Sequence, residues 1–225
     1  MAVKTIVCLA TSRKSGGRCI AGKELTSAKW VRPVSGRDTE EISEEEQKYE
    51  DGSLPKLLDI LKIPIKIHKP NLFQTENYLI DDNVFWEKAG EFSGRLDDLL
   101  DYPENLWGIG SSSYQGLNDR FSETHYNNYT ESLYLIKPQS LKIIVRIEGE
   151  ESDNPKRKVR ARFKYKQQEY LWPITDPDVE RQYLCGDDGE FQLEATQYYL
   201  CVSVGLPYKG YCYKFVASII RGRQK

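Results

Sequence analysis

Histidines and closely spaced cysteines, the usual ligands of metal sites, are scarce in this sequence. It has two histidines, His68 and His125, and neither lies at metal-ligand spacing from a cysteine or a carboxylate. The cysteines are odd in number and contain no C-x-x-C pair, which indicates neither a disulfide framework nor a zinc ribbon. We therefore expect no metal, no cofactor and reduced thiols at Cys8, Cys19, Cys185, Cys201 and Cys212.

Long apolar runs are also missing. No stretch approaches the roughly 18 apolar residues that a membrane-spanning helix needs. The first ten residues are too short and wrongly flanked for a signal peptide. These absences lead us to expect a soluble, cytoplasmic protein without a membrane partner.

Charge is abundant, and it is distributed unevenly. Residues 1–37 hold eight Lys and Arg against one acid, residues 38–155 hold eleven against twenty-five, and residues 156–225 hold thirteen against eight. The overall pI near 5.9 therefore hides two basic ends and does not argue against a nucleic-acid partner. The alternative is that the acidic middle neutralises the basic ends within the protein itself.

The densest positive charge lies in one short segment, where basic residues alternate with Val159, Ala161, Phe163 and Tyr165. A period of two is typical of a β-strand with one apolar face and one charged face. Such a row suits a polyanion, but it also suits a protected sheet edge or pairing with the protein's own carboxylates. The charged residues are Lys158, Arg160, Arg162, Lys164 and Lys166.

The remaining pattern predicts a mainly β fold with short helices. The expected helices are residues 84–90 and 95–101, and a strand over 57–68 is expected to bend or restart at Pro64. Dense short strands favour small barrels over a parallel sheet. We expect a first β-unit over residues 1–80, a helical and loop-rich connecting region over 81–130, and a second β-unit over 131–225. The predicted strands are 3–10, 18–21, 30–34, 132–136, 141–147, 159–166, 169–174, 198–204 and 211–220.

Two further basic positions are candidates for anion binding. Arg13, Lys14 and Arg18 flank Gly16 and Gly17, which allow a close backbone approach, although an exposed hairpin tip explains them as well. Arg32 lies beside Trp30 on a segment stiffened by Pro33. Such an arginine can read a base or phosphate, or it can simply cover a packed ring.

A Gly- and Ser-rich segment, residues 106–120, ends in Asn118, Asp119 and Arg120. It has neither the Gly-Lys-Ser/Thr ending of a phosphate loop nor the G-x-S-x-G spacing of a nucleophile elbow. An ordered structural loop is the expected interpretation. Asp119 beside Arg120 is either a local ion pair or part of a polar site.

Five phrases spread over nearly the whole chain carry a family resemblance: residues 11–22, 30–35, 49–52, 132–138 and 198–220. Together they resemble the dual OB-containing domain family of prokaryotes. The resemblance implies two OB-like β-barrels in one compact chain, a nucleic-acid-binding role and frequent association with bacterial defence or mobile-element systems. It implies no established catalytic residues.

The sequence therefore predicts an accessory or sensor protein that binds DNA or RNA, single-stranded or locally opened. One alternative is a protein-interaction module that docks a larger effector enzyme. Another is an enzyme acting on a nucleotide or nucleic acid through Asp119 and Arg120. Rings available for stacking are Tyr170, Trp172, Tyr211 and Tyr213, which core packing explains equally well. The predicted binding residues are Arg13, Lys14, Arg18, Arg32, Lys158, Arg160, Arg162, Lys164, Lys166 and Trp172.

Overall fold

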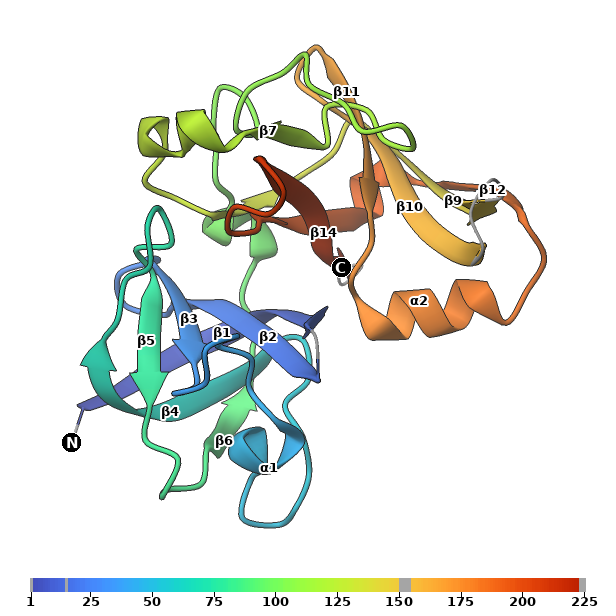
Figure 1. Ribbon diagram of the computed structural model, residues 1–225. Coiled ribbons are helices and arrows are strands. Elements are labelled where there is room, and N and C mark those ends of the chain that lie inside the picture. The colour runs from blue at the N-terminus through green and yellow to red at the C-terminus, as the bar shows by residue number, and fades with distance from the viewer. Residues whose placement is uncertain (1, 15, 150–154, 223–225) are drawn as a thin grey trace. The chain divides into compact units, whose positions relative to one another are not determined.

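The computed structural model describes residues 2–14, 16–149 and 155–222 (Figure 1). The chain forms two compact units, which are described separately. Residues 1–99 with 130–132 form the first unit, and residues 100–129 with 133–225 form the second. The segment 81–130 contributes to both, because it supplies β6 (Glu87–Glu91) to the first unit and β7 (Arg120–Ser122) to the second.

The first unit is a closed five-stranded barrel, which is the architecture of an OB fold. The strand order is β1-β2-β3-β5-β4, and β4 pairs back onto β1. All neighbours are antiparallel except β3 and β5, which are parallel. A short helix, α1 (Glu44–Gln47), lies between β3 and β4 in the chain. The strands are β1 (Ala2–Lys14), β2 (Gly17–Glu24), β3 (Trp30–Val34), β4 (Asp59–His68) and β5 (Asn77–Ile80).

The second unit repeats this connectivity without closing. Its first three strands form an antiparallel meander, and helix α2 (Pro177–Leu184) separates the third strand from the last two. A parallel bridge between Ile174 and Val216 joins the end of the third strand to the fifth. The strands are β9 (Ser140–Glu148), β10 (Lys156–Tyr165), β11 (Gln168–Pro173), β13 (Tyr198–Val204) and β14 (Tyr211–Arg221).

Two additional strands take the positions where closure of this unit would occur. The first strand of the meander, β9, pairs with β12 (Gly189–Leu193), and β13 pairs with β8 (Leu133–Ile136). The sheets are therefore β11-β10-β9-β12 and β7-β14-β13-β8. The predicted mainly β fold with short helices and two OB-like units is confirmed, with one unit closed and the other an open half-barrel.

Aliphatic side chains make up most of both cores, and the second core also contains a cluster of aromatic rings. In the second unit Phe163 stacks on Tyr170 at 5.2 Å between ring centroids, and Trp172 meets both rings edge-on. These rings come from the apolar face of β10 and the matching face of β11. These three rings therefore pack inside the second unit.

The prediction of a helix over residues 84–90 is wrong. Residues 87–90 belong to strand β6, which pairs with β4, and residues 84–86 precede that strand, so tertiary pairing overrides the local pattern. The second expected helix is a 3₁₀ turn over Leu96–Leu99. Helix α2 was not predicted, although Asp176 caps it and Pro177 stands in its first turn, both familiar start signals.

Candidate functional site

Positive charge gathers on one face of the β11-β10-β9-β12 sheet, here called the outer face. Directly opposed residues of antiparallel strands share a face, and the register places Lys158 opposite Arg146 and Arg162 opposite Lys142. Among the paired strand residues that the structure describes, seven cations against three carboxylates leave an excess of four positive charges. The cations are Lys142, Arg146, Lys156, Lys158, Arg160, Arg162 and Lys164, and the carboxylates are Glu148, Glu169 and Glu190.

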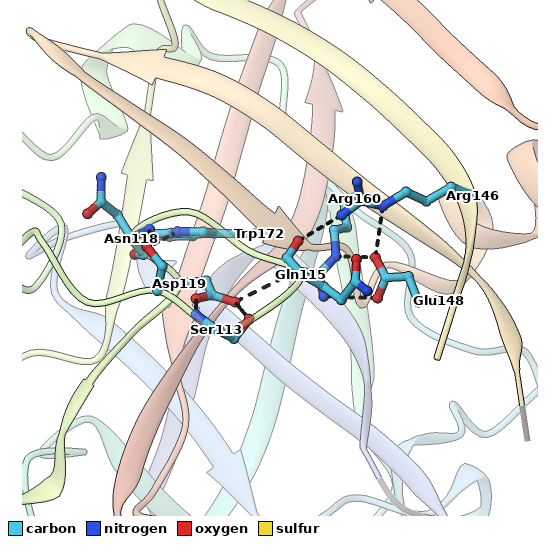
Figure 2. A network of polar contacts seen from close by, with 9 residues as sticks. Ser113, Gln115, Asn118, Asp119, Arg146, Glu148, Arg160 and Trp172 are labelled. Carbon is cyan, nitrogen blue, oxygen red and sulfur yellow. Dashed lines mark hydrogen bonds and ion pairs between the residues drawn. The ribbon is translucent and has the colours of Figure 1, made fainter. Parts of the chain in front are cut away.

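The centre of the outer face is neutralised from within the protein. Arg160 is 8% exposed and donates two hydrogen bonds to Glu148, from Nε at 2.6 Å and from Nη2 at 3.1 Å. Asp119 lies 3.8 Å from Nη1 of the same guanidinium (Figure 2). A buried charge needs such partners, so Arg160 is held as a structural residue and is not presented to a phosphate.

The flanks of the outer face remain exposed. Arg162 lies 3.5 Å from Glu169, and both side chains are about half exposed. Lys142 contacts Glu190 at 2.7 Å in a similarly open setting. Exposed pairs of this kind contribute roughly 0–1 kcal/mol, so a phosphate can replace the carboxylate at little cost.

Two lysines of the row have no ion pair with any residue that the structure describes. Lys158 is half-buried beside Arg146, and Lys164 is exposed beside Glu169, whose carboxylate contacts Arg162 instead. Lys166 is exposed at the turn between β10 and β11, with its ammonium 5.9 Å from the Tyr165 ring centre. The predicted basic row is thus divided into a neutralised centre at Arg160 and open positions at Lys158, Arg162, Lys164 and Lys166.

The Gly- and Ser-rich loop packs against the outer face. The Ser113 amide and hydroxyl both donate to the Asp119 carboxylate, and the Gln115 carbonyl accepts from Arg146 Nη2 at 2.9 Å. Leu117 pairs with Leu171 of β11, which extends the sheet by one residue. Figure 2 shows Gln115 and Asp119 of the loop in contact with Arg146 of β9 and Arg160 of β10. The loop therefore covers Arg160 and is itself held in place.

Gly116 is required for this packing. A Cβ atom at that position would lie 1.9 Å from Oδ2 of Asp119, well inside any allowed contact. Asn118 adds further anchors, because its side chain donates to the Glu169 carbonyl at 2.9 Å and accepts from the Gly110 amide at 2.6 Å. The ordered structural loop expected from the sequence is held by hydrogen bonds of the Asn118 and Asp119 side chains.

A buried lysine anchors the start of the same loop. The Lys214 side chain, on β14, is fully buried, and its ammonium donates to the Gly108 carbonyl at 2.8 Å. Burial lowers the pKa of Lys214 to about 7, and the negative charge of Asp119 opposes that shift.

The adjacent residues Asp119 and Arg120 do not pair with each other as one interpretation proposed. Asp119 contacts Ser113 and Arg160, whereas the Arg120 guanidinium lies 3.9 Å from the Tyr211 ring centre.

The ring expected to stack on bases is enclosed in the core. Trp172 is 0% exposed, and its Nε1 donates to the Asn118 carbonyl at 2.9 Å. It lies opposite Ala161, on the apolar face of the sheet, and Tyr170 shares that face. Neither ring has an exposed face to offer a base, because the strand period that exposes the cations directs these rings inward.

In the first unit, Arg13 and Arg18 lie directly opposite each other near the end of the β1–β2 hairpin, on one face of the strand pair. Lys14 pairs with Gly17 in the same register, and a Cβ on Gly17 would lie 2.4 Å from the Ile42 carbonyl oxygen. Arg13 is exposed, and Lys14 and Arg18 are half-buried. The end of the hairpin therefore carries three cations, and its backbone at Gly17 passes close to the backbone of Ile42.

Arg32 occupies a different environment from these residues. It is 4% exposed, lies 3.1 Å from Glu76 and donates to the Ser132 hydroxyl at 2.9 Å. Ser132 in turn donates to Glu76, which completes a buried triad. The cation over the Trp30 ring is Lys23, at 5.2 Å. Arg32 is thus a neutralised internal residue, and it presents no free guanidinium for reading a base.

Sequence reasoning missed Lys142 and Arg146, which join the row from β9. The signal was present, because both residues alternate with the apolar residues of a predicted strand that leads into the basic one. Among the described residues, no group of three or more His, Cys, Asp or Glu side chains is placed to hold a metal ion. In the same part of the chain, no helix is both long and apolar enough to cross a membrane.

Comparison with known families gives a match over most of the chain. The model of a family described as "Dual OB-containing domain" matches residues 4–219, nearly the whole chain. No curated protein and no solved structure matches the chain. The family description agrees with the closed barrel and the open half-barrel of the structure.

Proposed function

The chain belongs to the dual OB-containing domain family, and on that basis we propose that it binds single-stranded nucleic acid through the outer face of β9 and β10. The observation that carries the proposal is the pairing of like charges across these strands, Lys158 with Arg146 and Arg162 with Lys142. Directly opposed like charges destabilise a sheet. A bound phosphate backbone relieves this repulsion, and each neutralised phosphate releases counterions.

The role of each cation in this proposal follows from its burial. Lys158, Arg162, Lys164 and Lys166 contact phosphates, together with Lys142 and Arg146. Arg160 keeps the strands in register through Glu148 and does not contact the ligand. OB folds commonly bind oligonucleotides on the second and third strands, which correspond to β10 and β11 in this unit.

The β1–β2 hairpin supplies a second phosphate contact in the same proposal. Arg13, Lys14 and Arg18 lie at the loop between the first two barrel strands, a position that OB folds use for ligands. The opposed pair Arg13 and Arg18 repeats the like-charge arrangement of the outer face. The contact at the hairpin is argued only from residues of the first unit, and the contact at the outer face only from residues of the second unit.

The wider role is also part of the proposal. We place the protein in the cytoplasm, where a reducing environment suits its five free cysteines. An accessory or sensor function in a bacterial defence or mobile-element system rests on family membership alone. Whether a larger effector protein joins the complex is decided by co-purification after nuclease and high-salt washes.

The test is a titration of labelled single-stranded DNA and RNA by fluorescence anisotropy, between about 50 and 200 mM salt. Binding is expected to weaken with salt by about 0.7 log units per log unit of salt for each phosphate neutralised. The double variant Lys158→Gln, Lys164→Gln should reduce that slope by about 1.4. A salt-independent affinity, or no binding to any oligonucleotide, would overturn the proposal.

The matched control removes two lysines that have carboxylate partners. Lys62 contacts Glu87 at 2.8 Å, and Lys66 contacts Asp82 at 2.5 Å, both on β4 of the first unit. The double variant Lys62→Gln, Lys66→Gln changes the net charge by the same amount. It should leave the salt slope unchanged, and an equal reduction would show that net charge, rather than the outer face, governs binding.

A further inference from the structure

Tyr114 is the most exposed of the large hydrophobic and aromatic side chains that the structure describes, at 92%. It belongs to the loop that packs on the outer face, where the neighbouring residues are held by hydrogen bonds. An exposed aromatic ring on an anchored backbone has no packing role of its own. In the proposed function the cations of this face contact phosphates, and Tyr114 has no role.

The backbone on both sides of Tyr114 is fixed. Ser113 donates its amide and hydroxyl hydrogens to Asp119, and the Gln115 carbonyl accepts from Arg146. Gly116 then passes in close contact with the Asp119 carboxylate. Because these contacts already order the loop, a ligand that stacks on the ring does not have to order the backbone first.

The same contacts hold the segment that carries Tyr114 against the outer face. Arg146, which holds Gln115, is an outer-face residue and lies directly opposite Lys158. Three residues after Tyr114, Leu117 pairs with Leu171, which lies opposite Arg162 on the same face. The loop that carries Tyr114 therefore contacts the outer face near both of its like-charge pairs.

An aromatic ring beside a row of cations is the combination that binds single strands, with bases on the ring and phosphates on the cations. We propose that Tyr114 is the stacking platform for an unpaired base, so that this chain prefers single strands to duplexes. The inference rests on the proposed function and deepens it. A duplex would gain only the phosphate contacts, since its bases already stack on one another.

The experiment compares Tyr114→Ala, Tyr114→Phe and Tyr114→Trp for binding to single strands and to a duplex of matched sequence. Loss of a stacked base costs about 5- to 150-fold in affinity, so Tyr114→Ala should weaken single-strand binding within that range. Tyr114→Phe should bind like the original chain and Tyr114→Trp at least as tightly. Duplex affinity should be unchanged in all three variants.

The control is Tyr102→Ala, which removes another exposed ring, 75% exposed, outside the loop. It should leave single-strand affinity unchanged, and both Ala variants should keep the unfolding midpoint because neither ring is buried. If the lysine variants weaken binding and Tyr114→Ala does not, the stacking inference fails and the proposed function stands. Equal losses on single strands and duplex, or an equal loss in Tyr102→Ala, would also overturn the stacking inference. No binding at all by the original chain would overturn both proposals.

Discussion

Arg160 on β10 and Glu148 on β9 form a two-point ion pair in which each side chain is only 10% exposed. Arg162, two residues along the same face, is 42% exposed and lies 3.5 Å from Glu169. The two arginines look alike in the sequence. Their surroundings differ: Arg160 is neutralised by buried partners, whereas Arg162 is exposed and is one of the residues proposed to contact phosphate.

Arg160→Gln is expected to lower the free energy of unfolding by about 3 kcal/mol, because removing one partner leaves a buried charge without its main counterion. Arg162→Gln, the matched control, should change it by less than about 1 kcal/mol, since its pair is exposed. Urea denaturation measures both. If both variants lowered the free energy of unfolding by the same amount, the ion pair between Arg160 and Glu148 would not contribute more to stability than the exposed pair of Arg162.

Arg13 and Arg18 lie directly opposite each other in the first barrel, so removing one of their charges should raise the free energy of unfolding, whereas Arg160→Gln should lower it. Arg18→Gln removes the repulsion with Arg13 and is expected to stabilise the barrel by about 0.2–1 kcal/mol at low ionic strength. Salt screens the repulsion, so the difference should shrink as salt is added. Thermal unfolding of the variant and of the original chain at low and high salt measures this difference in stability. A difference that does not change with salt would contradict the electrostatic explanation.

Lys214 should make stability depend on pH. Its pKa is lowered from 10.5 to about 7 in the folded chain, so between these values the unfolded chain binds a proton that the folded chain does not. Stability therefore rises with pH over this window, by up to about 1.4 kcal/mol per pH unit, and the gain is lost as pH falls toward 7.

Lys214→Met isolates this contribution. The original chain and the variant share their cysteines and tyrosines, so the difference between their unfolding free energies reports the lysine. That difference should change in favour of the original chain as pH rises from about 7 to 9, measured by urea denaturation. Parallel pH profiles would mean that Lys214 titrates normally in the folded protein.

Gly116→Ala tests the packing of the loop against the outer face. The added methyl group meets the Asp119 carboxylate, and overpacking of this kind costs about 1–3 kcal/mol. Gly36→Ala is the control, because nothing lies within 4 Å of its added Cβ. It should stay within about 0.5 kcal/mol of the original chain in a denaturant titration. A neutral Gly116→Ala would show that the loop can move away from Asp119.

Much of the fold follows from local pattern. Alternation in Lys158 to Lys166 predicts a strand with one charged and one apolar face, and β10 has that form. The same rule, applied to Trp172 and Tyr170, would have placed both rings on the inner face with Phe163. The helix predicted over 84–90 failed because pairing with β4 outweighed a weak local preference.

The amino-acid order thus determines where positive charge lies along a strand and that the strand has two faces. Which of those charges are neutralised depends on partners distant along the chain. Glu148 lies 12 positions from Arg160, on the neighbouring strand, and Asp119 comes from a loop 41 positions away. Strand register and loop packing bring these carboxylates to Arg160 and leave Lys158 and Lys164 without such partners among the described residues. Charge neutralisation is a matter of distance in space, and distance in space is set by tertiary structure.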